Sequence, residues 1–304
     1  MKFDFLSESD KAFFIHKAST LVEALPYIRQ HAGKNIVIKY GGHAMIDPKL
    51  AKNFSKDICL LKQIGINPII VHGGGPQINE ALRKKKIDSS FISGLRITDK
   101  KTIKVVEHVL SNEINKKIVE NIKHFGGKAK RLIGNKNNLI YDKKLKIENK
   151  NPVSKNKQKI DLGFVGLPTK ISVDVINKII SNKGIPVISP LGIDKEGKTY
   201  NINADTAAGA IAVALKASKL LLLTDVSGIM NQKNKLISLL SNSEAKKVLN
   251  KRFVVGGMRP KILTCIQSID DGVGQATILD GRIPHSLILE LFTEHGIGTQ
   301  IYSK

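Results

Sequence analysis

The chain has 304 residues, of which 41% are hydrophobic and 25% are charged, which excludes global disorder and fits one large domain or two lobes. Lysine and arginine number 49 against 26 acidic residues, so the net charge of +23 suggests an anionic partner: nucleic acid, a membrane surface or a phosphorylated substrate. No apolar run approaches ~18 residues and acidic residues interrupt the N-terminus, so neither a transmembrane helix nor a secretory signal is predicted. Two distant cysteines, Cys59 and Cys265, form no CxxC pair, which excludes a disulfide scaffold and predicts a cytoplasmic location.

Short apolar runs alternate with longer segments of helical period. After an N-terminal helix expected over Ser9–Ala18, five runs of branched aliphatic residues predict buried strands, at 35–40, 67–72, 185–189, 219–225 and 275–280. Helices are expected at 47–63, from Pro76, and at 99–124, 204–216, 243–250 and 258–270, with β-hairpins within 127–166. The alternation predicts an α/β fold, a three-layer αβα sandwich with a mainly parallel open sheet. Ligands of such folds bind at the carboxyl ends of the strands.

The first two predicted strands both end in glycines. Lys39 lies near the end of the first, where a buried ammonium is costly unless it faces a site, and Gly41-Gly42 follows. The second strand ends at His72 and continues into Gly73-Gly74-Gly75 and a helix opened by Pro76. Because bare amides at a helix N-terminus attract anions, we expect an anion site here. Its spacing matches neither GxGxxG nor a Walker A loop.

Two later segments place polar residues at the start of a helix. Residues 201–206 read Asn-Ile-Asn-Ala-Asp-Thr ahead of an alanine-rich helix, a pattern that is also found in a plain N-cap. Gly256-Gly257 precedes another helix, whose first turn holds Lys261. A cation opposes the helix dipole at that position, and a bound anion would remove the conflict. Lys261 is therefore a candidate anion-binding residue.

Residues 192–199 match the P-loop pattern GxxxxGK[ST] and follow a predicted strand. Asp194 and Glu196 within the loop would repel phosphate, and the residues after Thr199 are a poor helix start. We therefore predict a β-turn between two strands at this place and no P-loop.

The basic excess is concentrated in residues 81–160, which carry a net charge of +15, and its densest part, 142–159, alternates lysine with asparagine. A groove for single-stranded nucleic acid would interleave aromatic rings with the lysines, whereas only Tyr141 and Phe164 flank this run. The pattern predicts a solvated hairpin or loop. Neither nucleic acid nor a membrane is expected as a partner.

Taken together, eight segments resemble the amino-acid kinase family. Each is a weak signal alone, but they run in order with compatible spacing from about residue 20 to the end. GLRITD and YNINAD fit best the branch of the family that acts on N-acetyl-L-glutamate. The segments are IVIKYGGHAM, IIVHGGGPQI, GLRITD, DLGFVG, YNINADTAAGAIA, LLLLTDVSGI, GGMRPKI and LDGRIPHSLILELFTEHGIGTQI.

The resemblance implies phosphoryl transfer from MgATP to the γ-carboxylate of N-acetyl-L-glutamate, giving an acyl phosphate for arginine biosynthesis. The substrate carboxylate is already an ionised nucleophile, so such a reaction needs charge neutralisation and positioning more than a general base. Carried over by motif, Lys39 and Lys261 would stabilise the transferring group from either side, and Asp205 would hold both lysines. The implied acetylglutamate-binding residues are Gly74, Gly75, Arg96 and Asn201.

The resemblance also implies how the nucleotide is bound. Magnesium would arrive with ATP and be held mainly by phosphates and water, so no resident metal site is expected. Residues 1–20 would form an oligomerisation extension, 21–190 a lobe for acetylglutamate binding and dimerisation, and 191–304 a lobe for ATP. Gly42, with Gly74, would offer amides to the phosphates. The implied nucleotide-binding residues are Gly41, Gly42, Thr224, Asp225, Gly257 and Met258.

Both ends of the chain resemble those of arginine-sensitive members of the family. In these members a similar N-terminal helix links dimers into a hexamer, and here Phe13 and Phe14 would share one helix face. The C-terminal segment resembles their arginine-binding stretch, with His285, Glu294 and Gly296 as the candidate residues. We therefore predict a homo-oligomer, a dimer and more specifically a hexamer, inhibited by arginine. A PII signalling protein is a possible further partner that the sequence does not support.

Two other functions remain open from the sequence. An aspartate- or glutamate-type kinase of the same fold would act on free amino acids. A panel of free and acetylated substrates distinguishes it from a kinase that acts on N-acetyl-L-glutamate. A non-catalytic, kinase-like protein would bind DNA or RNA through lysines 143–159, with affinity that falls steeply with salt.

Overall fold

The buried strands form one mainly parallel sheet, which confirms the predicted fold class. The computed structural model describes residues 3, 6–149, 158–251, 253–254 and 256–303. Neighbouring strands of the main sheet pair in parallel, except β13 with β14. In spatial order the eight strands are β12 (Leu239–Ser241), β14 (Thr299–Tyr302), β13 (Gln275–Asp280), β11 (Lys219–Thr224), β1 (Asn35–Tyr40), β2 (Asn67–His72), β8 (Ile185–Ser189) and β5 (Ala129–Ile133).

Helices cover both faces of this sheet, as the alternating pattern predicts. Successive strand residues point to opposite faces, so Val37 belongs to one hydrophobic core and Ile36 and Ile38 to the other. The first core includes α7 (Val173–Ser181), α8 (Ala204–Ala214), α9 (Asn242–Leu249) and α10 (Met258–Asp270). The second includes α3 (Pro48–Gln63), α4 (Gly75–Lys84), α5 (Lys100–His108), η3 (Val109–Ile114), α6 (Asn115–His124) and α11 (Ser286–Phe292).

The predicted helix over 99–124 is continuous but not uniform. Asp99 caps it, accepting from the amides of Lys101 and Thr102, and α5, η3 and α6 follow without a break. The middle segment, η3, is π-helical. Such wide turns are rare and occur often at functional sites, and this one lies beside the glycine loop after β2.

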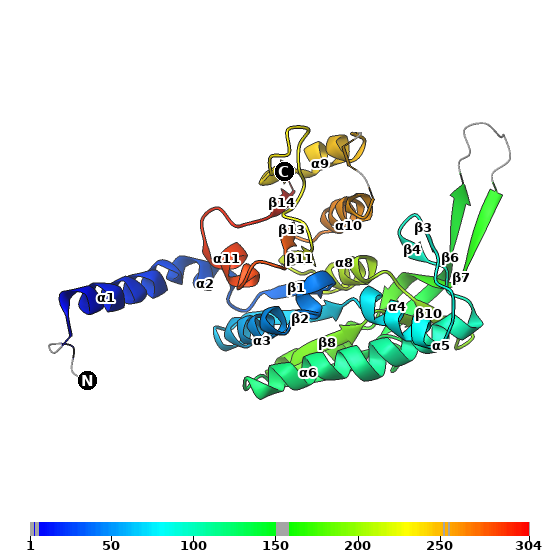
Figure 1. Ribbon diagram of the computed structural model, residues 1–304, viewed down its shortest axis with the longest axis horizontal. Helices are drawn as coiled ribbons and strands as arrows, with labels where there is room; N and C mark the ends of the chain where they lie inside the picture. Colours follow the sequence, from blue (N-terminus) through cyan, green and yellow to red (C-terminus); the bar gives the residue numbers. More distant parts are fainter. Residues whose placement is uncertain (1–2, 4–5, 150–157, 252, 255, 304) are drawn as a thin grey trace.

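A small closed barrel beside the main sheet was not predicted. It consists of β6 (Ile140–Asn149), β7 (Gln158–Ile171), β9 (Leu191–Ile193) and β10 (Thr199–Asn201). β9 and β10 pair antiparallel around Gly197, so the predicted β-turn at 192–199 is confirmed. β6 and β7 form a long projecting hairpin that carries the lysine-rich run (Figure 1), whose residues 150–157 lie outside the described residues.

The first N-terminal helix lies apart from the body of the fold, and a second one joins it to that body. Helix α1 (Glu8–Glu23) starts before the predicted Ser9, because the Ser7 hydroxyl caps it by accepting from the Asp10 amide. α1 buries none of its residues and projects outward, while α2 (Leu25–His31) joins it to the body beside α11 (Figure 1). Within the described residues, no helix combines the length and the apolar character needed to cross a membrane.

Asp142 on β6 is an uncompensated buried carboxyl. It is 6% exposed, and neither oxygen has a hydrogen-bond partner among the described residues. A Cβ at Gly166 or Gly192 would clash with this carboxyl, so both glycines make room for it. Burial, and secondarily the negative charge of Asp194, raise the pKa of Asp142 to about 8. The barrel therefore holds a carboxyl that stays largely protonated at neutral pH.

We predict that Asp142 makes the fold less stable as pH rises. Between about pH 4 and pH 8 the folded protein keeps a proton that the unfolded chain has released. The contribution of Asp142 to the free energy of unfolding therefore falls by about 1.4 kcal/mol per pH unit. Asp142→Asn cannot ionise, and its free energy of unfolding relative to wild type should increase from pH 5 to pH 7 in urea titrations. The exposed Asp161→Asn, whose pKa is already low, is the control with a constant difference. A constant difference for Asp142→Asn as well would contradict the prediction.

Candidate active site

A cleft of about 340 Å³ opens where β1 and β2 end, the place predicted for ligands of this fold. The N-termini of α4, α8 and α10 meet at it, and their dipoles favour bound negative charge. The predicted residues that line it are Lys39, Gly41, Gly42, Gly74, Gly75, Arg96, Asn201, Asp205, Gly257 and Lys261.

Asp205 lies between two lysines at the bottom of this cleft. Its Oδ1 is 3.2 Å from the Lys39 ammonium and its Oδ2 is 2.6 Å from that of Lys261. The three side chains are at most 13% exposed. They come from β1, α8 and α10, which are far apart in sequence, so only the tertiary structure brings them together.

The charges in this triad control one another. Burial alone would raise the pKa of Asp205, but the two ammonium groups outweigh it and hold the value at about 2. Burial lowers the pKa of Lys39, although the Asp205 carboxylate partly offsets that effect. The triad has one negative and two positive charges, and its excess positive charge faces the cleft. An anion bound there would complete the neutralisation.

Local sequence determines how each member is presented. Asn203 caps α8 by accepting from the amides of Asp205 and Thr206, so the N-cap that this segment suggested is present at Asn203. Asp205 itself is left free to face the lysines. α10 has no side-chain cap, and Lys261 in its first turn is compensated by Asp205.

Glycine backbone lines the cleft. Gly42 has φ +70°, and a Cβ there would clash with the Asp225 carboxylate, which accepts from the His43 amide at 2.7 Å. A Cβ at Gly74 would lie 2.6 Å from Ile114 Cδ1 and 2.7 Å from Leu110 Cδ2. These contacts exclude side chains at both positions, which keeps the amides accessible to a ligand.

Arg96 lines the cleft from the short hairpin of β3 (Phe91–Ile92) and β4 (Leu95–Arg96). Its guanidinium donates to Ser89 and to Asn79 Oδ1 at 2.6 Å, and it lies 4.6 Å from the centre of the Phe91 ring. These contacts orient a planar fork of donors suited to a carboxylate.

Three of the predicted nucleotide residues, Thr224, Asp225 and Met258, do not line this cleft. Asp225 is adjacent to it through Gly42 and His43. Of the predicted arginine residues, Glu294 and Gly296 line a separate cavity of about 370 Å³. His285 does not line that cavity, and its Nδ1 instead lies 2.6 Å from Asp57 on α3.

Sequence reasoning missed the hairpin wall of the cleft, formed by Phe91, Gly94 and Leu95. Ser93 and Gly94 form the turn between β3 and β4, and both have positive φ. A Ser-Gly pair between apolar residues is the available signal for such a turn. The strands are only two residues long, which is too short for a periodic pattern.

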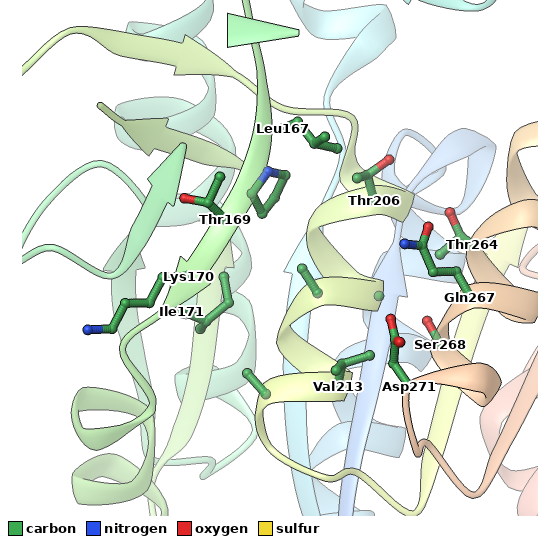
Figure 2. A pocket seen from close by; sticks show the side chains of 14 residues that line it. Leu167, Thr169, Lys170, Ile171, Thr206, Val213, Thr264, Gln267, Ser268 and Asp271 are labelled. Carbon is green, nitrogen blue, oxygen red and sulfur yellow. The ribbon is translucent and has the colours of Figure 1, made fainter. Parts of the chain in front are cut away.

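A second cavity of similar size, about 380 Å³, contains none of the predicted site residues. It lies along α8, with β7 on one side and α10 on the other (Figure 2). Thr206 lines this cavity, whereas its neighbour Asp205 faces the cleft. Volume alone therefore does not identify the site, and the converging charges and helix N-termini do.

Comparison with known proteins shows the family of the chain. The model of the amino acid kinase family matches residues 34–280. An acetylglutamate kinase from Rhodospirillum centenum is 50% identical over 291 residues, covering 96% of this chain and 95% of that protein. One from Syntrophus aciditrophicus is 48% identical over 285 residues, covering 94% and 96%.

Solved structures show the same architecture. N-acetylglutamate synthase from Neisseria gonorrhoeae, complexed with coenzyme A and N-acetyl-glutamate, superposes with a TM-score of 0.82 at 25% identity, over 94% of this chain and 63% of that one. Carbamate kinase from Giardia lamblia bound to AMP-PNP superposes with a TM-score of 0.67 at 17% identity, over 90% and 100%. The second likeness concerns the fold alone.

We predict that Asp205→Asn destabilises the fold by about 3–5 kcal/mol, because it leaves two buried ammonium groups unpaired. The loss should shrink toward alkaline pH, where Lys39, with its lowered pKa, gives up its proton in the folded protein before it does in the unfolded chain. Added inorganic phosphate should recover part of the stability. Denaturant titrations at pH 7 and pH 9.5 measure both effects.

The control is Asp270→Asn, which removes the exposed partner of Lys246 and should cost at most about 1 kcal/mol. Equal losses for the two variants would contradict the buried-triad account.

Proposed function

The chain belongs to the amino acid kinase family, and we propose that within it the chain catalyses the ATP-dependent phosphorylation of N-acetyl-L-glutamate to N-acetyl-L-glutamyl 5-phosphate, in arginine biosynthesis. Acetylglutamate kinases about 50% identical over nearly the whole chain support this activity. The observation that carries the chemistry is the buried Lys39–Asp205–Lys261 triad at the ends of the strands.

The reaction requires little covalent chemistry from the protein. A γ-carboxylate oxygen of the substrate forms a bond to the γ-phosphorus of ATP, the bond from that phosphorus to the β–γ bridging oxygen breaks, and ADP leaves. Lys39 and Lys261 neutralise the charge of the transferring group from two sides, and Asp205 keeps the ammonium groups in place. The substrate carboxylate needs no general base, since it is already ionised.

Magnesium fits this site as a companion of the nucleotide. Both Asp205 oxygens lie within ion-pair distance of a lysine, and the described residues hold no cluster of three or more His, Cys, Asp or Glu side chains for a metal. Phosphate and water oxygens would therefore supply most ligands of the ion, which would contribute charge neutralisation. The amides of Gly41, Gly42 and Gly74 would face the phosphates. Thr224, Asp225, Gly257 and Met258 remain the proposed continuation of the nucleotide site.

Recognition of acetylglutamate is proposed for the other half of the cleft. Arg96, already oriented by Asn79 and Ser89, would bind the α-carboxylate. Asn201 lies at the end of β10, with its amide 3.5 Å from Thr98 Oγ1, and would contact the acetylated end together with Gly75. Free aspartate or glutamate lacks that acetyl group, so a substrate panel tests the alternative kinase assignment.

We predict that Lys261→Ala lowers kcat about 100- to 1,000-fold, because one of two cations on the transferring group is lost. Lys198→Ala is the matched control: it removes the lysine of the P-loop-like sequence, which is exposed and paired with Glu196. Coupled measurement of ADP release with N-acetylglutamate should show a normal rate for the control. Loss of turnover in Lys198→Ala but not in Lys261→Ala would overturn the assignment.

Regulation by arginine is proposed for the cavity lined by Glu294 and Gly296. Residues of α2, including Tyr27 and His31, line the same cavity. Lys219 and Glu290 form a buried ion pair there, 3.5 Å apart. The cavity thus offers carboxylates for a guanidinium and an ammonium for a carboxylate. Residues of α2 and of the C-terminal segment therefore meet at this cavity.

The N-terminal extension is proposed to join dimers into a hexamer. Helix α1 exposes Phe13, Phe14 and Ile15 by about half each, and Leu21 and Val22 by more, with no residue of α1 buried in the protomer. A second copy of this helix would cover that surface. The lobe boundaries at residues 20 and 190 and the cytoplasmic location stay predictions, whereas PII binding has no support in the sequence.

We predict that arginine inhibits the enzyme and that its solution mass is that of a hexamer. Citrulline, which keeps the shape of arginine but lacks the charge, should inhibit at least tenfold more weakly because no cation faces Glu294. Glu294→Gln should reduce arginine inhibition and leave KM for acetylglutamate unchanged. A dimer mass with no response to arginine would contradict this proposal, which light scattering and initial rates test directly.

A further inference from the structure

We infer that His72 and Asn115 are positioning residues, which fix the peptide between Gly73 and Gly74 so that the Gly74 amide faces the reacting groups. This inference rests on the phosphoryl transfer proposed above. It assigns a role to the histidine of the VHGGGP segment, which the site description has not used.

The two side chains form a wholly buried contact beneath the glycine loop. His72 is the last residue of β2 and Asn115 is the first of α6, and both are 0% exposed. Asn115 Nδ2 lies 3.2 Å from His72 Nε2, and His72 Nδ1 lies 2.9 Å from the carbonyl oxygen of Gly73.

Backbone carbonyls determine which way this chain of hydrogen bonds runs. Asn115 Nδ2 lies 2.9 Å from the Val187 oxygen and 3.5 Å from the Leu132 oxygen. Carbonyl oxygens only accept, so the amide nitrogen must face them. One N–H donates to Val187, and the other is shared between the Leu132 oxygen and the nearer His72 Nε2, at 3.2 Å. Nε2 therefore accepts, and the ring proton is on Nδ1, which donates to Gly73. Burial lowers the pKa of His72 to about 4, so the ring is neutral at physiological pH.

This hydrogen bond determines the direction of the next amide. In a planar trans peptide the carbonyl and the N–H point in opposite directions. His72 holds the Gly73 carbonyl toward the protein interior, so the Gly74 N–H points toward the cleft that Gly74 lines. No acceptor for this N–H is present in the part of the chain that the structure describes.

The remaining groups of the loop are held as well. The Gly73 amide donates to the Tyr40 carbonyl at 2.7 Å, and the Gly74 carbonyl accepts from the Ile78 amide at 2.9 Å. Three successive glycines would otherwise sample many conformations. A donor that is oriented before the reaction stabilises developing charge without reorganisation, so its fixed direction contributes to rate. The π-helical η3 ends directly before Asn115 and places that residue under the loop.

Two histidine variants separate positioning from a merely structural role. His72→Asn places an amide near Nδ1 and can still donate to the Gly73 carbonyl. His72→Gln places its amide near Nε2, which keeps the Asn115 contact and loses the Gly73 contact. We expect kcat to fall about 10- to 100-fold in His72→Gln, more than KM changes, and His72→Asn to recover most of that loss.

Asn115→Leu tests the other end of this relay, the chain of hydrogen bonds from Asn115 through His72 to the Gly73 carbonyl. Without the amide donor, Nε2 loses its hydrogen bond while Nδ1 still donates to the Gly73 carbonyl, so ¹⁵N spectra of the imidazole should show the Nδ1–H form in both proteins from pH 5 to pH 9, with the Nε2 resonance shifted in the variant. The rate should fall to a similar extent. Asn112→Leu, which removes the exposed Asn112–His108 contact on the same helical segment, is the control with normal rate and spectrum.

Equal kcat in His72→Gln and wild type would overturn the inference. So would equal losses in His72→Gln and His72→Asn that follow their loss of thermal stability. If wild type fails to phosphorylate acetylglutamate, the proposed function fails instead. The tautomer spectra would still report whether the relay exists.

Discussion

The structure depends on a single buried carboxylate. Asp205 is 5% exposed and is flanked by the ammonium groups of Lys39 and Lys261, which come from different elements. Removing this negative charge would leave two like charges at the base of the cleft, where burial strengthens their repulsion. The three side chains together carry a net positive charge, which is available to an anionic ligand. The ion pairs that link β1, α8 and α10 therefore also leave a positively charged site for phosphate.

The backbone provides the second half of the site. Three helix N-termini and the glycine loops after β1 and β2 present amide groups to the cleft. Their directions are set from below, by buried side chains such as His72 and Asn115. The functional surface consequently has few conspicuous side chains. Phosphoryl transfer to a carboxylate suits such a site, since positioning and charge neutralisation account for most of the catalysis.

The charged groups outside the cleft differ in their surroundings, since a few, such as Asp142, are buried and most lie on the surface. Among the residues that the structure describes, no cation compensates the buried Asp142, and its raised pKa lowers the stability of the fold as pH rises. Most of the net positive charge lies on solvated surfaces, including the β6–β7 hairpin. The charges that matter for the proposed reaction are a small subset at the ends of strands and helices. Net charge by itself thus says little about the substrate.

The sequence by itself determined the α/β class, because runs of branched aliphatic residues and helical periods encode local structure directly. It also indicated Lys39, the glycine loops and Lys261, since a buried-strand lysine and a cation at a helix N-terminus are locally unfavourable without a ligand. Resemblance to a family added Asp205, Arg96 and Asn201.

Only the tertiary structure decided which of these residues meet. The closed barrel depends on contacts between distant segments, which no local pattern contains, and the short hairpin that holds Arg96 packs against β7 through β4. The proton position on His72 was likewise set by carbonyls of β5 and β8. Local preference fixes elements, whereas the site is a property of their packing, because charges and hydrogen-bond partners far apart in sequence become neighbours only in the fold.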